Sequence, residues 1–205
     1  MKKKLFAALT AAAILGAASA FAAPVTHPGV GNANIDLGTW QVKDKFSDGG
    51  YSVSTDHSWN FTGGITYGVS DNWALQYQYH NMDASDPKVT GDEHEINAIY
   101  TFNPNISGFV GWNRITGKLG GFSGENNVVQ VGVNARYPIA EKLDVYGQLA
   151  VGSESTFLWE AGLAYDINRN FSANLGYRGV RTDFDDVTFK NEGLTLGLTY
   201  HLMDL

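Results

Sequence analysis

The sequence contains no cysteine and only five prolines, and after its first 22 residues it has no long apolar run. The absence of cysteine excludes disulfide bonds, thiol nucleophiles and cysteine-based metal sites. No later stretch approaches the ~20 consecutive apolar residues that a membrane-spanning helix requires. Basic residues are also scarce: the formal charge is −7, and no basic patch is visible beyond the first residues. An acidic chain of this kind is not expected to bind nucleic acid.

The N-terminal segment has the three parts of a secretory signal peptide. Lysines occupy positions 2–4, an apolar stretch follows from Leu5 to Gly16, and Ala20-Phe21-Ala22 supplies the small residues of a cleavage site. We expect cleavage after Ala22, with cleavage after Ala20 as the alternative. The predicted organisation is therefore a signal peptide at 1–22 and one domain at 23–205. Removing the leader removes three lysines and takes the formal charge from −7 to −10.

The rest of the chain alternates apolar and polar residues with period two, which is typical of β-strands with two unlike faces. In the segment 58–69, Trp59, Phe61, Ile65 and Tyr67 share one face, while glycine, hydroxyl and amide residues share the other. Such strands suit a water-soluble sandwich or a membrane barrel. We predict ten strands, at 34–46, 57–69, 73–82, 93–102, 106–115, 126–138, 143–152, 156–167, 171–181 and 191–203.

The connections between these segments alternate in length. Tight turns rich in Asn, Asp and Pro follow every second strand, whereas the polar segments 47–56, 83–92, 116–125 and 182–190 are longer. Bacterial outer-membrane barrels have short periplasmic turns and longer extracellular loops. This pattern predicts that both termini are periplasmic, which requires an even number of strands.

The positions of the outward aromatic residues distinguish a membrane barrel from a water-soluble sandwich. Once strand direction is taken into account, they fall at two heights, with aliphatic residues and no charges between them, as in the aromatic girdles of a membrane barrel. The predicted girdle residues are Trp59, Tyr67, Trp73, Tyr79, Phe102, Trp112, Tyr137, Trp159, Tyr165, Phe171, Tyr177 and Tyr200. We therefore predict an all-β fold: a closed, antiparallel, up-and-down transmembrane β-barrel of ten strands. Eight strands and a soluble lipocalin-like or sandwich fold are the alternatives.

The first strand fits this pattern least well. Ile35 and Leu37 share one face, but Trp40 and Val42 lie on the other. We expect either a bulge or an inward Trp40.

The C-terminal segment carries a motif of a known family. Thr195, Gly197, Tyr200 and Leu202 match, in order, the polar-x-Gly-x-x-apolar-x-apolar assembly signal of small bacterial outer-membrane barrels. The chain resembles these OmpA-type and opacity-type proteins over residues 23–205. The family usually ends on an aromatic residue, whereas this chain continues to Leu205. The resemblance implies a location in the outer membrane and, as partners, its lipids including lipopolysaccharide, periplasmic chaperones and the barrel assembly machinery.

Inward ionisable residues are the candidates for chemistry. If the strands are reflected through their turns, Glu160 lies opposite Arg178, and Arg136 lies opposite Asp144. Such pairs form either a charged gate or an ionic plug, and we favour the plug because an inward charge needs a partner. Inward glycines, including Gly111, Gly132, Gly162 and Gly176, are expected to leave gaps that would admit a thin thread of water.

The sequence predicts a structural or surface-exposed outer-membrane barrel with a mostly plugged polar lumen. A narrow porin-like channel for ions or very small solutes is the alternative. Eight-stranded barrels are filled by their own side chains and barrels of sixteen or more strands enclose a water-filled channel, so ten strands leave room for a narrow path at most. A lipid-modifying membrane enzyme is less favoured, since no His-x-Ser occurs at a strand end. We expect no catalytic residue, cofactor or metal. Binding of an extracellular ligand by the loops, the oligomeric state and the identity of any solute are left open by the sequence.

Overall fold

The computed structural model describes residues 29–48, 51–54, 57–81, 83, 89–119, 122–153, 155–184 and 187–203. The predicted signal peptide at 1–22 lies outside the described residues. Among the residues described, no helix is long and apolar enough to cross a membrane.

Ten long strands form the wall, and one short strand extends it. The wall strands are β1 (Ala33–Asp48), β3 (Ser58–Gly68), β4 (Trp73–Asn81), β5 (Val89–Asn103), β6 (Ile106–Leu119), β7 (Phe122–Ala140), β8 (Leu143–Gly152), β9 (Thr156–Asp166), β10 (Phe171–Phe184) and β11 (Val187–Leu202). The short strand is β2 (Tyr51–Ser54), which pairs only with the end of β1.

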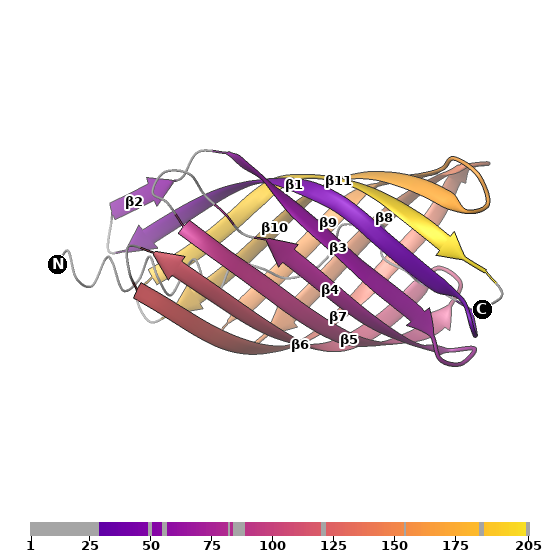
Figure 1. Cartoon of the computed structure of the whole chain (residues 1–205), viewed down its shortest axis with the longest axis horizontal. Coiled ribbons are helices and arrows are strands. Elements are labelled where there is room, and N and C mark those ends of the chain that lie inside the picture. The colour runs from indigo at the N-terminus through magenta and orange to yellow at the C-terminus, as the bar shows by residue number, and fades with distance from the viewer. Residues whose placement is uncertain are drawn as a thin grey trace.

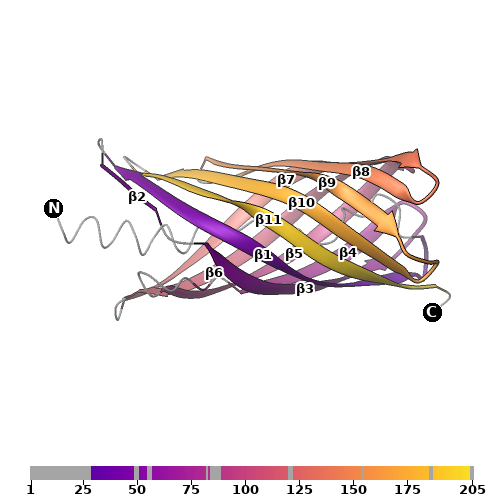
Figure 2. The same cartoon turned by 90° about the horizontal axis from the view of Figure 1, so that it is seen from above.

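The sheet closes on itself. Each wall strand pairs antiparallel with the next one in sequence, and β11 pairs with β1 over a continuous register from Ala33↔Leu202 to Asp48↔Val187. The strands cross the molecule at a steep tilt, as Figures 1 and 2 show. Closure leaves no unpaired edge in the wall, which is what a sheet in lipid requires. The prediction of a ten-stranded closed barrel is confirmed.

The two ends of the barrel differ, and we name them by their connections. The turn end carries the start of β1, the end of β11 and the tight turns. Asn168 stabilises one of these turns, because its side-chain oxygen accepts hydrogen bonds from the backbone N–H groups of Asn170 (2.8 Å) and Phe171 (3.0 Å). The hairpin end carries β2 and the longer connections.

At the hairpin end the strands are longer than predicted. Strands β6 and β7 remain paired out to Leu119↔Phe122, and β10 and β11 out to Phe184↔Val187. The prediction of loops at 116–125 and 182–190 is wrong over most of both segments. An antiparallel ladder is held by backbone hydrogen bonds, so it can continue beyond the membrane-facing apolar belt.

Strand β1 is regular. Its register with β3 and with β11 contains no shift, so there is no bulge. Trp40 instead faces inward and is 1% exposed. The irregular apolar pattern of this strand therefore reflects an aromatic residue placed inside the barrel.

Candidate functional site: the barrel lumen

Polar side chains fill the interior of the barrel. Burial alternates along each strand, with the inward residues covered and the outward ones exposed, as in β3 and β9. Many of the buried residues are polar or charged, including Gln78, His80, Glu93, Glu95, Asn97, Asn113, Gln130, Gln148, Glu160 and Arg178. The lumen is therefore the place where the chain gathers its buried ionisable groups.

A group of four charged residues joins opposite walls of the barrel. Glu160 on β9 lies directly opposite Arg178 on β10, at the register that the sequence predicts. Arg178 also interacts electrostatically with Glu93 and Glu95 on β5. Strand β5 is five strands away from β10 in either direction around the wall, so this electrostatic interaction acts across the lumen. We call Glu93, Glu95, Glu160 and Arg178 the charge cluster.

Neighbouring side chains hold the charge cluster in place. The Arg178 guanidinium carbon lies 5.7 Å from the ring centroid of Trp40, within the range of a cation–π interaction. The Tyr146 hydroxyl donates a hydrogen bond to Glu160 Oε1 (3.0 Å), and Gln130 Nε2 donates one to Glu95 Oε1 (2.7 Å). Such contacts compensate Glu95, Glu160 and Arg178 for part of their lost hydration, whereas neither carboxyl oxygen of Glu93 has a hydrogen-bond partner in the described part of the chain.

A chain of amide groups continues from the charge cluster along the wall. Asn97 Nδ2 donates to Gln76 Oε1 (2.9 Å), and Gln76 Nε2 donates to Thr66 Oγ1 (3.0 Å). Gln130 Nε2 also approaches Asn97 Oδ1 at 3.4 Å. These contacts cross-link strands β3, β4, β5 and β7 on their inner faces, so they fix the packing of side chains within the lumen.

A second ionic group lies at the turn end. Arg136 Nε contacts Asp144 Oδ2 at 2.5 Å, and its Nη2 lies 3.4 Å from Asp166 Oδ1. The predicted register of this pair is wrong: Arg136 lies opposite Tyr146, because the hairpin turns at residues 141–142, between the paired residues Ala140 and Leu143, and not at Ala140. The arginine side chain is long enough to reach Asp144 diagonally, so the ion pair forms in this register as well.

The inward glycines do not leave open gaps at the positions where we expected them. A Cβ atom at Gly162 would lie 2.5 Å from Tyr146 Cζ, and one at Gly176 would overlap the hydroxyl of the same tyrosine. Similarly, the ring of Phe109 occupies the space beside Gly132, and the amide of Asn97 occupies that beside Gly111. Large side chains therefore fill the space that these glycines provide.

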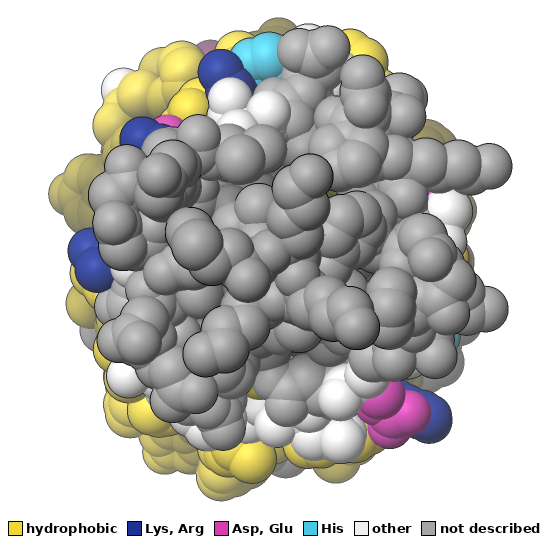
Figure 3. Space-filling model, turned by 90° about the vertical axis from the view of Figure 1, so that its left-hand side faces the viewer, with side chains coloured by type: hydrophobic (Ala, Val, Ile, Leu, Met, Phe, Trp, Pro, Cys, Tyr) yellow, Lys and Arg dark blue, Asp and Glu magenta, His cyan; other side chains and the backbone are white. Residues whose placement is uncertain are grey.

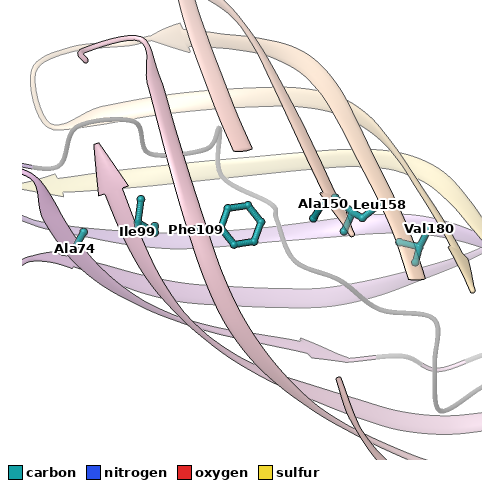
Figure 4. Packing of buried hydrophobic residues seen from close by; sticks show 6 residues of the cluster. All are labelled: Ala74, Ile99, Phe109, Ala150, Leu158 and Val180. Atoms are coloured by element: carbon teal, nitrogen blue, oxygen red, sulfur yellow. The ribbon is translucent and has the colours of Figure 1, made fainter. Parts of the chain in front are cut away.

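An apolar band, which the sequence analysis missed, also runs along the inner wall of the barrel. Its members are Ala74, Ile99, Phe109, Ala150, Leu158 and Val180, all at most 5% exposed. They follow the ladder from β4 to β10, each opposite the next, with Gly132 between Phe109 and Ala150. Figure 4 shows the six side chains in a row. The inner face is therefore not uniformly polar.

The predicted girdle residues all lie on the outer face. Nine of the twelve are exposed, whereas Tyr79, Trp159 and Tyr200 are partly covered by neighbours. Rings also pair along the wall: the Phe171 and Tyr200 centroids are 4.8 Å apart at the turn end, and those of Trp159 and Tyr177 are 6.0 Å apart at the hairpin end. We call Tyr67, Trp73, Phe102, Tyr137, Tyr165, Phe171 and Tyr200 the turn-end girdle. The hairpin-end girdle consists of Trp59, Tyr79, Trp112, Trp159 and Tyr177.

One polar group on the outer face also escaped the sequence analysis. Asp92 and His94 are two residues apart on β5 and so share a face, a spacing that would have revealed them. His94 Nδ1 lies 2.8 Å from the Tyr77 hydroxyl, and its Nε2 lies 3.8 Å from Asp92 Oδ1. Thr116 donates to that same Asp92 oxygen (2.7 Å). The separation of His94 from Asp92 exceeds hydrogen-bond length, so the two do not form a catalytic relay in this structure.

The predicted assembly residues lie on the closing strand. In β11, Thr195 is buried in the lumen, whereas Gly197, Tyr200 and Leu202 are partly covered. Among the described residues, no group of three or more His, Asp or Glu side chains is arranged to hold a metal ion.

Comparison with known proteins gives the family. The sequence profile of the outer membrane protein beta-barrel domain matches residues 7–201, which is most of the chain. The protein belongs to this family. Membership places it in the bacterial outer membrane, with strands rather than helices crossing the bilayer.

Several solved structures are similar to this chain at low sequence identity. The outer membrane protease OmpT from Escherichia coli is 14% identical, with a TM-score of 0.51 over 83% of this chain and 96% of that one. Neisserial surface protein A is 15% identical, with a TM-score of 0.45 over 83% and 98%. The translocator domain of NalP from Neisseria meningitidis is 9% identical, with a TM-score of 0.46 over 97% and 94%. No curated protein sequence matches the chain.

Proposed function

We propose that this protein is a non-catalytic structural or surface barrel whose lumen is closed to solutes. The observation that carries the proposal is the charge cluster, in which Arg178 on one wall interacts with Glu93 and Glu95 on the wall opposite. The four side chains of the charge cluster are at most 2% exposed, so no open, water-accessible path passes beside them. The filled spaces beside Gly132, Gly162 and Gly176 support the same conclusion.

The proposal includes the route to the membrane. Residues 1–22 act as a signal peptide, and both termini stay periplasmic, so that the hairpin end faces outward. Thr195, Gly197, Tyr200 and Leu202 form the signal that periplasmic chaperones and the barrel assembly machinery recognise. The girdles then contact outer-membrane lipids, including lipopolysaccharide, and the hairpins are available to an extracellular ligand.

A narrow cation path is the second candidate, and the charge of the lumen favours it over an anion path. The inward face carries the acidic residues Asp36, Glu93, Glu95, Asp144, Glu160 and Asp166. Against these six carboxyl groups, the described part of the lumen contains the two arginines Arg136 and Arg178. If water penetrates this lumen at all, the fixed charge would exclude anions.

Conductance in a planar bilayer tests the proposal. The folded wild-type protein should show conductance close to that of the bare membrane. A variant that truncates Trp40, Tyr146 and Arg178 to alanine should conduct, because it removes the large groups from one section of the lumen. Each sample should first be shown to be folded by a shift in SDS gel migration on boiling.

The matched control truncates Trp59, Tyr77 and Tyr177, which are exposed on the outer face. This variant should remain silent, since the lumen is unchanged. Reproducible stepwise openings in the wild-type protein would contradict a closed lumen, and their ion selectivity would then identify the cation path.

A further inference from the structure

One part of the lumen wall gathers buried oxygen atoms that have no hydrogen-bond donor. Glu95 on β5 lies directly opposite Gln78 on β4 and directly opposite Asn113 on β6. Glu93 is two residues away on the same inner face of β5, and all four side chains are at most 4% exposed. Among the described residues, neither carboxyl oxygen of Glu93 has a hydrogen-bond partner, nor does Gln78 Oε1 or Asn113 Oδ1. We call Gln78, Glu93, Glu95 and Asn113 the oxygen patch.

The geometry of the barrel brings the atoms of the oxygen patch together. Residues directly opposite each other in an antiparallel ladder have Cβ atoms about 4.5–5.5 Å apart. The side chains all point inward from a curved wall, so their ends converge further toward the axis of the barrel.

The hydrogen bonds around the patch determine which way one of its amide groups points. Gln130 Nε2 donates to Glu95 Oε1 (2.7 Å), so the other end of this amide, Gln130 Oε1, is the acceptor for Asn113 Nδ2 (3.5 Å). A rotated Asn113 amide would place two oxygen atoms against each other. The oxygen of Asn113, and not its nitrogen, is therefore the atom left without a partner.

The charge around the oxygen patch favours a cation. The three carboxylates and the one guanidinium of the charge cluster carry three negative charges and one positive charge, a formal charge of −2 when all four are ionised. Buried charges in proteins are paired with an opposite charge or coordinate a metal ion. The single guanidinium of Arg178 is shared among the carboxylates of two walls, so it does not balance them.

We propose that the oxygen patch binds one divalent cation with the ligand preference of calcium inside the lumen. Calcium takes about six to eight oxygen ligands from carboxylates, amide carbonyl groups and water, at about 2.3–2.6 Å. The patch combines two carboxylates with two neutral amides, so it differs from a centre built of three or more acidic or histidine side chains. The inference concerns the same charge cluster as the proposed function, and it rests on that proposal for a closed lumen that retains the ion.

Folding with and without calcium tests the assignment. The full chain is folded from urea into uncharged detergent micelles that contain either Ca²⁺ or a chelator, because a closed lumen has to take up the ion as the barrel forms. Elemental analysis after dialysis then gives the bound calcium. The wild-type protein folded with Ca²⁺ should retain one ion per chain and should unfold at a higher urea concentration than the sample folded with chelator, since an ion that binds only the folded state stabilises it.

Two variants with matched controls locate the ion. Glu93→Gln removes a charged ligand, and Gln78→Met removes a neutral ligand without a change of charge and with little change of volume. Each should weaken calcium binding at least about tenfold. The controls are Asp36→Asn and Gln148→Met, which make similar changes at buried positions on β1 and β8 and should bind calcium as the wild type does. Acidic side chains are also present at the rim of the hairpin end (Figure 3), so these lumen controls are needed to separate the patch from weak surface binding.

The outcomes separate this site from the closed-lumen proposal. A folded wild-type protein that retains no calcium would overturn the site and would mean that protons neutralise Glu93, which lies opposite His80. An equal loss of calcium in the variants and in their controls would overturn it as well. Conductance is a separate readout on the same samples. Calcium that binds at the patch but exchanges at once with added chelator, in a barrel that conducts, would support the site and contradict the closed lumen.

Discussion

Tyr146 is the residue on which the packing of the lumen most clearly depends. Its ring and hydroxyl lie over Gly162 and Gly176 on the two following strands, and its hydroxyl reaches Glu160 of the charge cluster. A tyrosine can lie flat against the wall here only because neither glycine carries a side chain. The glycines are thus required by the tyrosine, and the tyrosine in turn supports a buried carboxylate.

We therefore predict that Gly162→Ala destabilises the barrel by about 1–3 kcal/mol, the usual cost of overpacking. The new Cβ would lie 2.5 Å from Tyr146 Cζ and 2.5 Å from the backbone oxygen of Leu175, so a side-chain rotation alone cannot relieve the clash. The control is Gly147→Ala, whose Cβ would meet nothing nearer than 3.6 Å. Urea unfolding in lipid vesicles measures both. Similar stabilities for the two variants would mean that Tyr146 does not occupy this space.

At the scale of the strand, the period-two pattern predicts which face each residue occupies. In β7, Val131 is 57% exposed, whereas its neighbour Gln130 is 3% exposed and hydrogen-bonded inside the lumen. What the pattern does not predict is where a strand ends beyond the membrane, because the hairpin extensions depend on backbone pairing alone. Similarly, the pattern does not predict that this hairpin turns at residues 141–142, which places Arg136 opposite Tyr146 and not opposite Asp144.

On the outer face, the depth of a residue in the membrane should determine how strongly an introduced charge destabilises the folded barrel. Val131 lies between Val110 and Val151 on the neighbouring strands, and all three side chains are exposed on the outer face. The substitution Val131→Arg should therefore cost about 2–4 kcal/mol in folding free energy. Ile139→Arg is on the same strand and face with a similar exposure of 55%, but lies beyond Tyr137 of the turn-end girdle. It should cost only about 0–1 kcal/mol. Folding titrations in vesicles would measure the difference, and equal costs would show that the apolar belt is misplaced.

For the whole molecule, the local sequence pattern predicts the barrel, but it does not predict which side chains of distant strands come together in the lumen. The pairing of Glu160 with Arg178 follows from reflection through one hairpin, so the sequence was sufficient to predict it. The approach of Glu93 to Arg178 depends on closure and on the stagger of ten strands, which no hairpin reveals. The apolar band was missed although its members pair along successive hairpins from β4 to β10, because each strand contributes one residue to it.

The final prediction tests the contact across the lumen. Removing Arg178 alone, as Arg178→Met, leaves three carboxyl groups without their shared cation and should cost about 3–5 kcal/mol. Adding Glu93→Gln should recover part of that loss, with a coupling of about 0.5–3 kcal/mol, because one of the repelling carboxylates is gone. The comparison cycle pairs Arg178→Met with Asp144→Asn at the turn end, where the carboxylate contacts Arg136 instead. Urea unfolding of the single and double variants gives both couplings. Coupling confined to the Glu93 cycle would establish that opposite walls are joined. Additive effects in that cycle would remove the cross-lumen contact and reopen the case for a cation path.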